Sequence, residues 1–233
     1  MPVFRLSDED ISFPPAYLAD EYGRLAVGGD LSPERLLLAY QCGLFPWFNP
    51  DEPIIWWSPD PRFVLFPDEL KVAKSMRPIF NQKKFTYSFD QHFRAIITNC
   101  REERLTDDGA GTWISDAMVE AYCRLHELGY AHSVEVLQDG KIVGGLYGIS
   151  LGKVFFGESM FAKVPNASKA GFITMVKILE AKGFWLIDCQ QETNHLRSLG
   201  GANIPRQHFL ELMAKNEKEE TIKGSWSDLI GGH

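Results

Sequence analysis

The chain lacks the features that mark several large classes of protein. Its cysteines lie far apart, without a Cys-x-x-Cys pair or a histidine at zinc-ligand spacing, which argues against a metal site and a disulfide framework. No apolar run approaches the ~20 residues that span a bilayer, and no secretory signal pattern opens the sequence. We therefore expect reduced thiols, a cytoplasmic location, no metal or other cofactor, and no membrane association.

An excess of positive charge is missing as well. The net charge is −7 and the pI is near 5.4, which argues against a surface that is basic all over and coats nucleic acid. One segment departs from this balance, because after Glu69 the predicted helix and loop up to Lys84 contain no acid. Its cations are Lys71, Lys74, Arg77, Lys83 and Lys84. Helical spacing would place the first three on one face, as a solvated surface or a contact for nucleic-acid phosphates.

What is present fits a small loop-rich N-terminal subdomain, residues 1–61, followed by a larger domain, residues 62–233. The first part is rich in proline and aromatic residues and contains one good helix, which Ser32 caps, Pro33 opens and Gly43 ends. Its large aromatics are Trp47, Phe48, Trp56 and Trp57. Such a cluster either packs a core or seam between subdomains, or forms a wall of a substrate site.

The larger domain combines helices with a sheet. Helical spacing predicts helices over 115–128 and 168–182, and apolar runs between turn signals predict strands over 131–137, 141–149, 153–161 and 184–190. The last two strands and the helix between them form a βαβ unit, so they should run parallel. We expect an α+β protein whose larger, α/β domain has a mixed sheet and resembles GNAT-type acetyltransferases.

Polar side chains end both strands of this unit. Asp188 and Gln190 close the last strand, where alternation would put them on one face, and Glu158 lies in the preceding strand. Carboxyl ends of parallel strands meet at one sheet edge, where open α/β sheets bind ligands. The carboxylates and the amide therefore predict a polar cleft, with a helix-cap or structural ion-pair role for Asp188 as the alternative.

The sequence does not contain the residue patterns that several catalytic mechanisms require. No serine stands in a nucleophile elbow, and Cys189 should point away from Asp188. The histidines show no ligand spacing; His195 is the candidate nearest to the strand end. Residues 159–167 contain no glycine for a phosphate loop, which disfavours an acyl-CoA-dependent N-acetyltransferase. That enzyme and a non-enzymatic tRNA- or peptide-binding module remain the alternative functions.

Six short motifs are more specific than these general patterns. They are Val27–Leu31, Gly43–Phe48, Trp56–Arg62, Gly111–Ile114, Phe156–Phe161 and Leu186–Gln190. Together they resemble the leucyl/phenylalanyl-tRNA–protein transferase family along nearly the whole chain. The resemblance implies an enzyme that moves Leu or Phe, and less readily Met, from aminoacyl-tRNA to the α-amino group of proteins with N-terminal Arg or Lys. The product is marked for N-end rule degradation.

The resemblance also implies site residues. The family's catalytic pair falls on Asp188 and Gln190, and its substrate-contacting positions fall on Trp47, Trp113 and Glu158. We expect Asp188 to orient groups or relay a proton, Gln190 to hydrogen-bond the ester or amine, and Glu158 to hold the cationic acceptor.

The remaining expected contacts are with the aminoacyl group and the tRNA body. The candidates for an apolar aminoacyl pocket, each with core packing as its alternative, are Leu146, Phe155, Met175 and Ile187. The basic segment would meet tRNA phosphates, and the protein is expected to be a monomer. The charged stretch from Arg101 to Asp108 has no assigned role.

Overall fold

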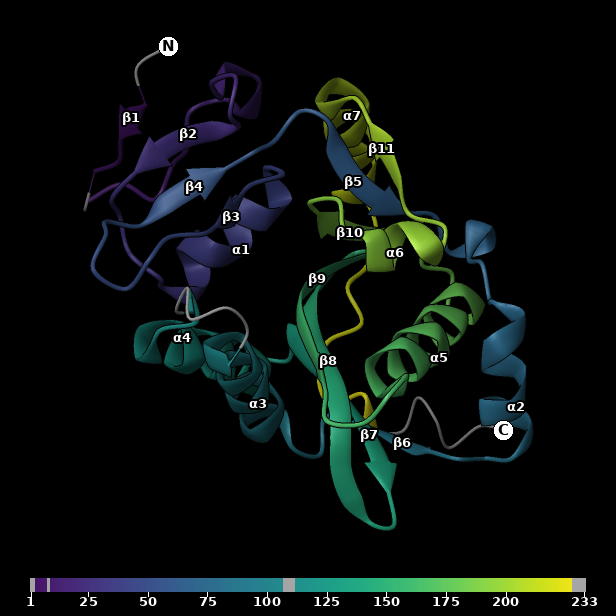
Figure 1. Ribbon diagram of the computed structural model, residues 1–233. Coiled ribbons are helices and arrows are strands. Elements are labelled where there is room, and N and C mark those ends of the chain that lie inside the picture. Colours follow the sequence, from purple (N-terminus) through teal and green to yellow (C-terminus); the bar gives the residue numbers. More distant parts are fainter. Residues whose placement is uncertain (1–2, 8, 107–111, 228–233) are drawn as a thin grey trace.

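The chain is built around a seven-stranded mixed sheet, shown in the computed structural model of Figure 1. The structure describes residues 3–7, 9–106 and 112–227. The strand order is β11-β5-β10-β9-β8-β7-β6. These strands are β5 (Arg62–Leu65), β6 (Thr86–Phe89), β7 (Ala131–Gln138), β8 (Lys141–Leu151), β9 (Val154–Ala162), β10 (Leu186–Gln190) and β11 (Ala202–Ile204).

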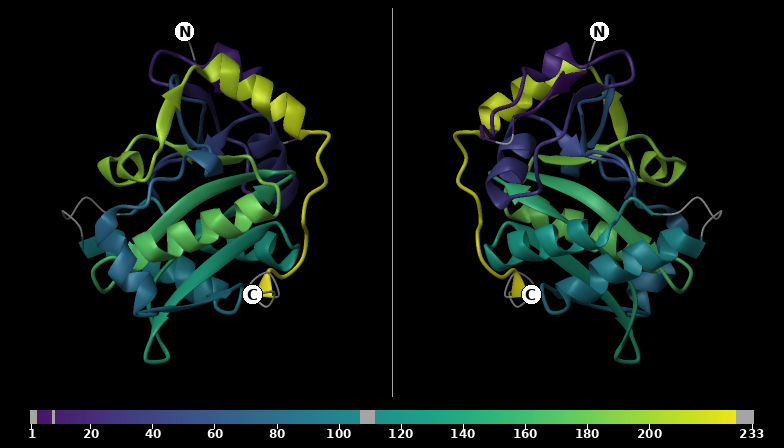
Figure 2. Two further views of the ribbon diagram at one scale, coloured as in Figure 1. Left: turned by 90° about the vertical axis from the view of Figure 1, so that its right-hand side faces the viewer. Right: turned by 90° about the vertical axis from the view of Figure 1, so that its left-hand side faces the viewer.

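Helices cover both faces of this sheet. α5 (Ala167–Ala181) packs on one face, and α3 (Phe93–Thr106) and α4 (Asp116–Glu127) pack on the other (Figures 1 and 2). The shorter elements outside these layers are η1 (Ala16–Leu18), η2 (Pro67–Glu69), η3 (Lys74–Met76), α2 (Arg77–Asn81), α6 (Asn194–Ser198) and α7 (Arg206–Asn216). The sheet is therefore sandwiched, with a hydrophobic cluster on each side.

Local signals in the sequence explain where the main helices begin. The Ser115 hydroxyl accepts a hydrogen bond from the Met118 amide at 3.2 Å and caps α4. Ser32 accepts from the Arg35 amide at 3.4 Å and caps α1 (Pro33–Gln41), as expected. α5 differs, because Asn166 precedes it with a φ of +71° and makes no side-chain capping bond.

A second, four-stranded sheet stands beside the first. It consists of β1 (Phe4–Arg5), β2 (Arg24–Val27), β4 (Ile55–Trp57) and β3 (Phe45–Pro46), in that order. Trp56 is fully buried in a hydrophobic cluster that also contains Ile96 of α3 and Met118 of α4. The small sheet thus shares its core with the larger body, and a domain boundary after Pro61 stays a prediction.

The basic segment is not the helix that its spacing predicted. Lys71 lies in irregular chain, where its amide donates to the Leu199 carbonyl at 2.9 Å, and only the short η3 and α2 follow. Pro78 has no N–H to donate, so a continuous helix cannot pass through it. The expectation of one helical face for Lys71, Lys74 and Arg77 is therefore wrong, although all three remain exposed.

The βαβ prediction is confirmed. β9 and β10 pair as parallel neighbours, with Leu186 opposite Val154, Ile187 opposite Phe155 and Asp188 opposite Phe156. β5 pairs with β10 in the antiparallel direction, as β8 does with β9. The α+β class with a mixed sheet is thus confirmed.

Candidate active site

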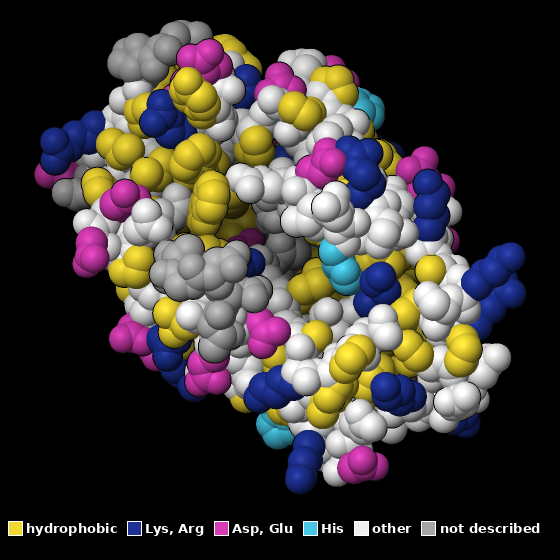
Figure 3. Space-filling model, in the orientation of Figure 1, with side chains coloured by type: hydrophobic (Ala, Val, Ile, Leu, Met, Phe, Trp, Pro, Cys, Tyr) yellow, Lys and Arg dark blue, Asp and Glu magenta, His cyan; other side chains and the backbone are white. Residues whose placement is uncertain are grey.

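The site opens where two parallel strands separate. The pairing of β10 with β9 ends at Asp188 and Phe156, while β9 continues along β8 as far as Ala162. A pocket of about 570 Å³ fills the space beyond this point. Figure 3 shows the hollow near the centre of the face, with hydrophobic side chains along its walls. The end of β10 therefore faces an open pocket, although helices cover both faces of the sheet.

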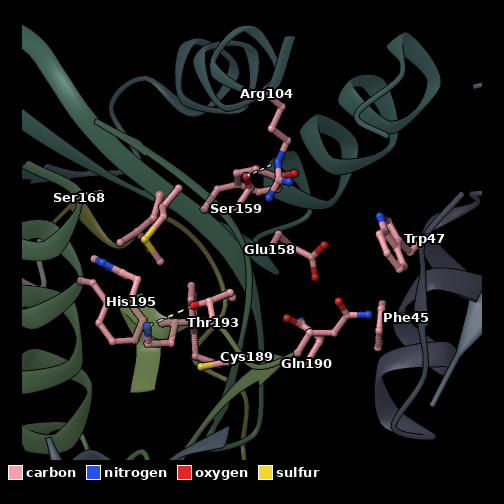
Figure 4. A pocket seen from close by; sticks show the side chains of 18 of the residues that line it. Phe45, Trp47, Arg104, Glu158, Ser159, Ser168, Cys189, Gln190, Thr193 and His195 are labelled. Carbon is pink, nitrogen blue, oxygen red and sulfur yellow. Dashed lines mark hydrogen bonds between the residues drawn. The ribbon is translucent and has the colours of Figure 1, made fainter. Parts of the chain in front are cut away.

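Two β-bulges direct polar side chains at this opening. Tyr147 pairs with Ser159 and Gly148 pairs with Gly157, so Glu158 is the extra residue in β9. In β10 the register shifts between Asp188 and Gln190, which leaves Cys189 unpaired with β5. Bulges bend a strand and re-aim its side chains, and they are frequent beside active sites. Glu158, Cys189 and Gln190 consequently all line the pocket (Figure 4).

The second bulge corrects an expectation about Asp188. Regular alternation would place Asp188 and Gln190 on one face, but Gln190 has a φ of +57° and faces the pocket, which Asp188 does not line. The Cys189 thiol lines the pocket too. The extra residue breaks the two-residue period on which the expectation depended.

Asp188 lies directly behind the pocket in a buried ion pair. Arg62 Nε donates to its Oδ1 at 2.8 Å and the Arg62 Nη2 donates to its Oδ2 at 2.6 Å; both side chains are fully buried. The Arg62 Cζ atom lies over the rings of Phe45 and Phe209, at 4.8 and 4.4 Å from their centroids. Asp188 Oδ1 also accepts the Gln190 amide at 3.0 Å. The carboxylate therefore holds the backbone of Gln190 in its unusual conformation.

Glu158 has a different environment and a different protonation. It is half-buried, and its two oxygens accept hydroxyl hydrogen bonds from Tyr40 at 2.6 Å and from Tyr122 at 3.0 Å. No cation pairs with it in the described part of the chain. Burial raises the pKa of Glu158 to about 7, and the hydroxyl bonds only partly offset this. The group can therefore gain or lose a proton near neutral pH.

The structure brings together most of the predicted substrate residues. Trp47 and Trp113 line the pocket, and Leu146 and Phe155 contribute apolar surface to it. Met175 and Ile187 do not line the pocket. Both are fully buried in the core between α5 and the sheet, so for them the packing alternative describes the structure. Burial and pocket lining produce the same apolar pattern in a sequence.

Sequence reasoning missed several residues of the site. Besides those already named, the lining includes Phe45, Arg104, Tyr147, Ser159, Met160, Ser168, Phe172, Thr193 and Leu196. Arg104 lies within the charged stretch without an assigned role; it donates to Ser159 at 3.2 Å and lies over the Trp113 ring. Residues 107 and 108 of that stretch, and Gly111 of the neighbouring motif, are outside the described residues. Arg62 belongs to the motif Trp56–Arg62, but nothing in the sequence indicated that it pairs with Asp188.

The described residues contain no group of three or more His, Cys, Asp or Glu side chains that would hold a metal ion. Cys189 is the thiol in the pocket, and burial raises its pKa, so it is protonated at neutral pH. Gln190 Nε2 is shielded from solvent and has no hydrogen-bond partner among the described residues. The groups that the site offers to a substrate thus include a titratable carboxyl, an amide and apolar side chains.

Comparison with known proteins places the chain among group-transferring enzymes. A family model described as leucyl/phenylalanyl-tRNA protein transferase matches residues 64–214, and a model for the N-terminal domain of the same family matches residues 29–60. The leucyl/phenylalanyl-tRNA–protein transferase of Syntrophobacter fumaroxidans is 54% identical, over 97% of this chain and 96% of the relative. That of Syntrophus aciditrophicus is 52% identical, over 100% and 99%. The chain therefore belongs to the leucyl/phenylalanyl-tRNA–protein transferase family.

Similarity to solved structures is weaker. A ribosomal-protein-alanine N-acetyltransferase from Brucella melitensis shares 15% identity at a TM-score of 0.33, over 43% of this chain and 74% of that one.

No helix in the described part of the chain has the length and apolar character needed to cross a membrane.

Proposed function

We propose that this protein transfers Leu or Phe, and less readily Met, from aminoacyl-tRNA to the α-amino group of proteins that begin with Arg or Lys. The observation that carries the proposal is the pocket itself. An apolar floor that contains Leu146 and Phe155 adjoins the Glu158 carboxyl and the Gln190 amide, in a chain of this family. Transfer marks the acceptor for N-end rule degradation.

The proposed chemistry needs few groups, because the donor is already an activated ester. The acceptor nitrogen attacks the ester carbonyl, an amide bond forms, the bond to the ribose oxygen breaks, and the nitrogen loses a proton. Positioning and a proton acceptor therefore supply most of the catalysis. Glu158, with a pKa of about 7, is the pocket carboxyl able to take that proton or to bind the acceptor's ammonium group.

Gln190 and Asp188 have complementary roles in this proposal. Gln190 offers an unpaired Nε2 donor to the pocket, suited to a carbonyl oxygen that gains negative charge during attack. Asp188 is a positioning residue, because both its oxygens are engaged by Arg62 and the Gln190 amide. Trp47 and Trp113 are placed to stack against the terminal adenosine, since both border the pocket.

The apolar floor supports the choice of amino acid. Leu146 and Phe155 lie among the largely apolar walls of a pocket of about 570 Å³, which suits an aromatic side chain or an aliphatic one that is not branched at Cβ. Side chains branched at Cβ place bulk next to the ester, where Glu158 and Gln190 already stand. Ile and Val are therefore expected to be poor substrates.

One assay separates this function from its alternatives. The protein is incubated with labelled Phe-tRNA and a peptide that begins with Arg, with acetyl-CoA as a parallel donor, and label in the peptide is measured. Transfer from Phe-tRNA is expected. Transfer from acetyl-CoA alone would indicate an N-acetyltransferase, and binding of tRNA without transfer would indicate a binding module.

A further inference from the structure

One edge of the pocket mouth carries a histidine and a lysine that the proposed chemistry does not use. His195 of α6 lines the pocket beside Ser168 of α5, and Figure 4 shows both on the side opposite Trp47. Lys169 follows Ser168 in the first turn of α5. Figure 3 shows a His side chain next to a Lys or Arg side chain at the rim of the hollow.

The positive charge at this edge is not neutralised by the protein. Lys169 is half-buried and forms no ion pair with any described residue, and the first turn of α5 contains no acid. The nearby acid Glu192 is engaged by Arg197 and Asn203. Burial, and then the charge of Lys169, lower the pKa of His195. Lys169 therefore stands near His195 without an anion to compensate it.

His195 has an unused hydrogen-bonding atom at the same place. Its Nε2 is shielded from solvent and has no partner among the described residues. A neutral imidazole still donates one hydrogen bond, and a ligand oxygen would satisfy that nitrogen. A buried polar atom without a partner is costly unless a ligand completes it.

The same helix joins this edge to the basic segment. Lys177, two turns beyond Lys169 on α5, lies over the ring of Phe80 in α2 at 5.7 Å from its centroid. α2 belongs to the basic segment of residues 71–84, and Figure 1 shows it alongside α5. Cationic side chains thus follow α5 from the basic segment to the pocket mouth.

We propose that Lys169 and His195 form a phosphate subsite at the mouth of the pocket, which binds a backbone phosphate in the single-stranded 3′ end of the donor tRNA. The inference rests on the proposed function, because it requires the aminoacyl group to occupy the apolar floor. In this proposal the nucleotide chain runs from the adenosine at Trp47 and Trp113 across the mouth to the opposite rim, toward the basic segment. An ammonium group and an imidazole N–H are suitable donors to phosphate oxygens, and such contacts fix register without reading sequence.

Two donors that differ in their phosphates test the subsite. Phe-tRNA and phenylalanyl-adenosine present the same ester, but the second has no phosphate. In Lys169→Ala and in His195→Asn, the ratio of kcat/KM for Phe-tRNA to kcat/KM for phenylalanyl-adenosine should fall about tenfold, as expected for loss of a charge-assisted hydrogen bond. Lys169→Arg should retain most of the ratio. Lys182→Ala, which removes an exposed lysine just beyond the other end of α5, is the matched control and should leave the ratio unchanged.

The possible outcomes separate the subsite from the proposed function. If the wild-type protein transfers from neither donor, the proposed function itself is wrong. If it transfers but the ratio is unchanged in Lys169→Ala and His195→Asn, the subsite is wrong and the function stands. An equal fall for both donors would show a structural role for these residues and would also overturn the subsite.

Discussion

At the scale of single residues, environment separates two carboxylates that the sequence places at the same sheet edge. Asp188 is fully buried, but a guanidinium compensates its charge with two hydrogen bonds. Glu158 is more exposed, yet it receives only hydroxyl bonds, and burial raises its pKa to about 7. Asp188, which is buried with a cationic partner, is thus a fixed anchor. Glu158, which is buried without one, is a group that titrates near neutral pH.

Glu158→Gln tests whether this titration serves the reaction. A carboxyl accepts a proton only when it is ionised, so wild-type kcat/KM should fall as pH drops below about 7. The variant should lose about 10²–10⁴-fold in kcat/KM, a usual range for a general base, and should lose this acid limb. A pH–rate profile of both proteins is the measurement. An acid limb that persists in Glu158→Gln would assign it to another group.

The raised pKa of Glu158 also predicts an effect on stability. The folded state holds this proton more tightly than the unfolded state, where the pKa is near 4.5, so the stabilising contribution is lost as pH rises toward 7. Glu158→Gln removes that loss. Its unfolding temperature should therefore exceed that of the wild type at pH 8 and match it more closely at pH 5. The opposite order would show that the Gln amide disrupts the tyrosine hydroxyl bonds.

Asp188 and Gln190 should respond differently to removal of their side chains. Asp188→Ala leaves Arg62 buried without its partner, which costs about 3–5 kcal/mol of unfolding free energy, and it should also lower kcat because Gln190 loses its anchor. Gln190→Ala should lower kcat but cost about 1 kcal/mol or less of unfolding free energy, since the side-chain Nε2 has no partner to lose. Urea unfolding and kcat are measured for both. Wild-type stability in Asp188→Ala would contradict the anchoring role.

At the scale of elements, the site depends on strand ends and bulges. The parallel pair β9 and β10 stops pairing at Asp188, and a bulge in the middle of β9 and another at the end of β10 turn Glu158 and Gln190 into the gap. α1 and α4 then reach this gap from the other side with Tyr40 and Tyr122. β3 of the smaller sheet contributes Phe45 and Pro46 to the lining, so elements of both sheets form the pocket.

The basic segment is a second element with a function of its own to test. Its cations are exposed and none forms an ion pair within the described part of the chain, so they are available to tRNA phosphates. Changing Lys71, Lys74 and Lys84 to Glu should weaken binding of all tRNA bodies alike. The plot of log K against log salt concentration has a negative slope, and each lost phosphate contact should reduce the magnitude of that slope by about 1. An unchanged slope would place the tRNA body elsewhere.

At the scale of the whole molecule, the C-terminal segment ties the layers together. After α7 the chain runs back along the outside of the molecule (Figure 2). The Asn216 side chain bonds both Leu151 and Lys153, and Trp226 is buried, stacked on His132 with ring centroids 3.7 Å apart. The Trp226 amide also donates to Asp90 at 2.6 Å.

Trp226→Ala should therefore destabilise the whole fold, although the residue does not line the pocket. Removal of a buried Trp leaves a cavity and costs about 3–5 kcal/mol. The unfolding free energy is measured by urea titration, with Lys218→Ala, an exposed substitution in the same segment, as the control. A loss near that of the control would mean that the C-terminal segment does not belong to the cooperative core.

The sequence alone determined the features that depend on neighbouring residues and on chain handedness. Ser32 and Ser115 specify helix starts because a hydroxyl bonds an amide three residues away, and the βαβ order specifies parallel neighbours. Those rules placed Asp188, Gln190 and Glu158 at one edge of the sheet.

Only the tertiary structure decided what these residues became. Arg62 reaches Asp188 across 126 positions of sequence, and Tyr40 reaches Glu158 across 118. The bulges at Glu158 and Cys189 exist because of the strands that pair with them, and one bulge reversed the expectation that Asp188 and Gln190 share a face. The protonation of a carboxyl group and the direction in which a side chain points depend on such distant partners. The pattern of neighbouring residues in the sequence does not identify these partners.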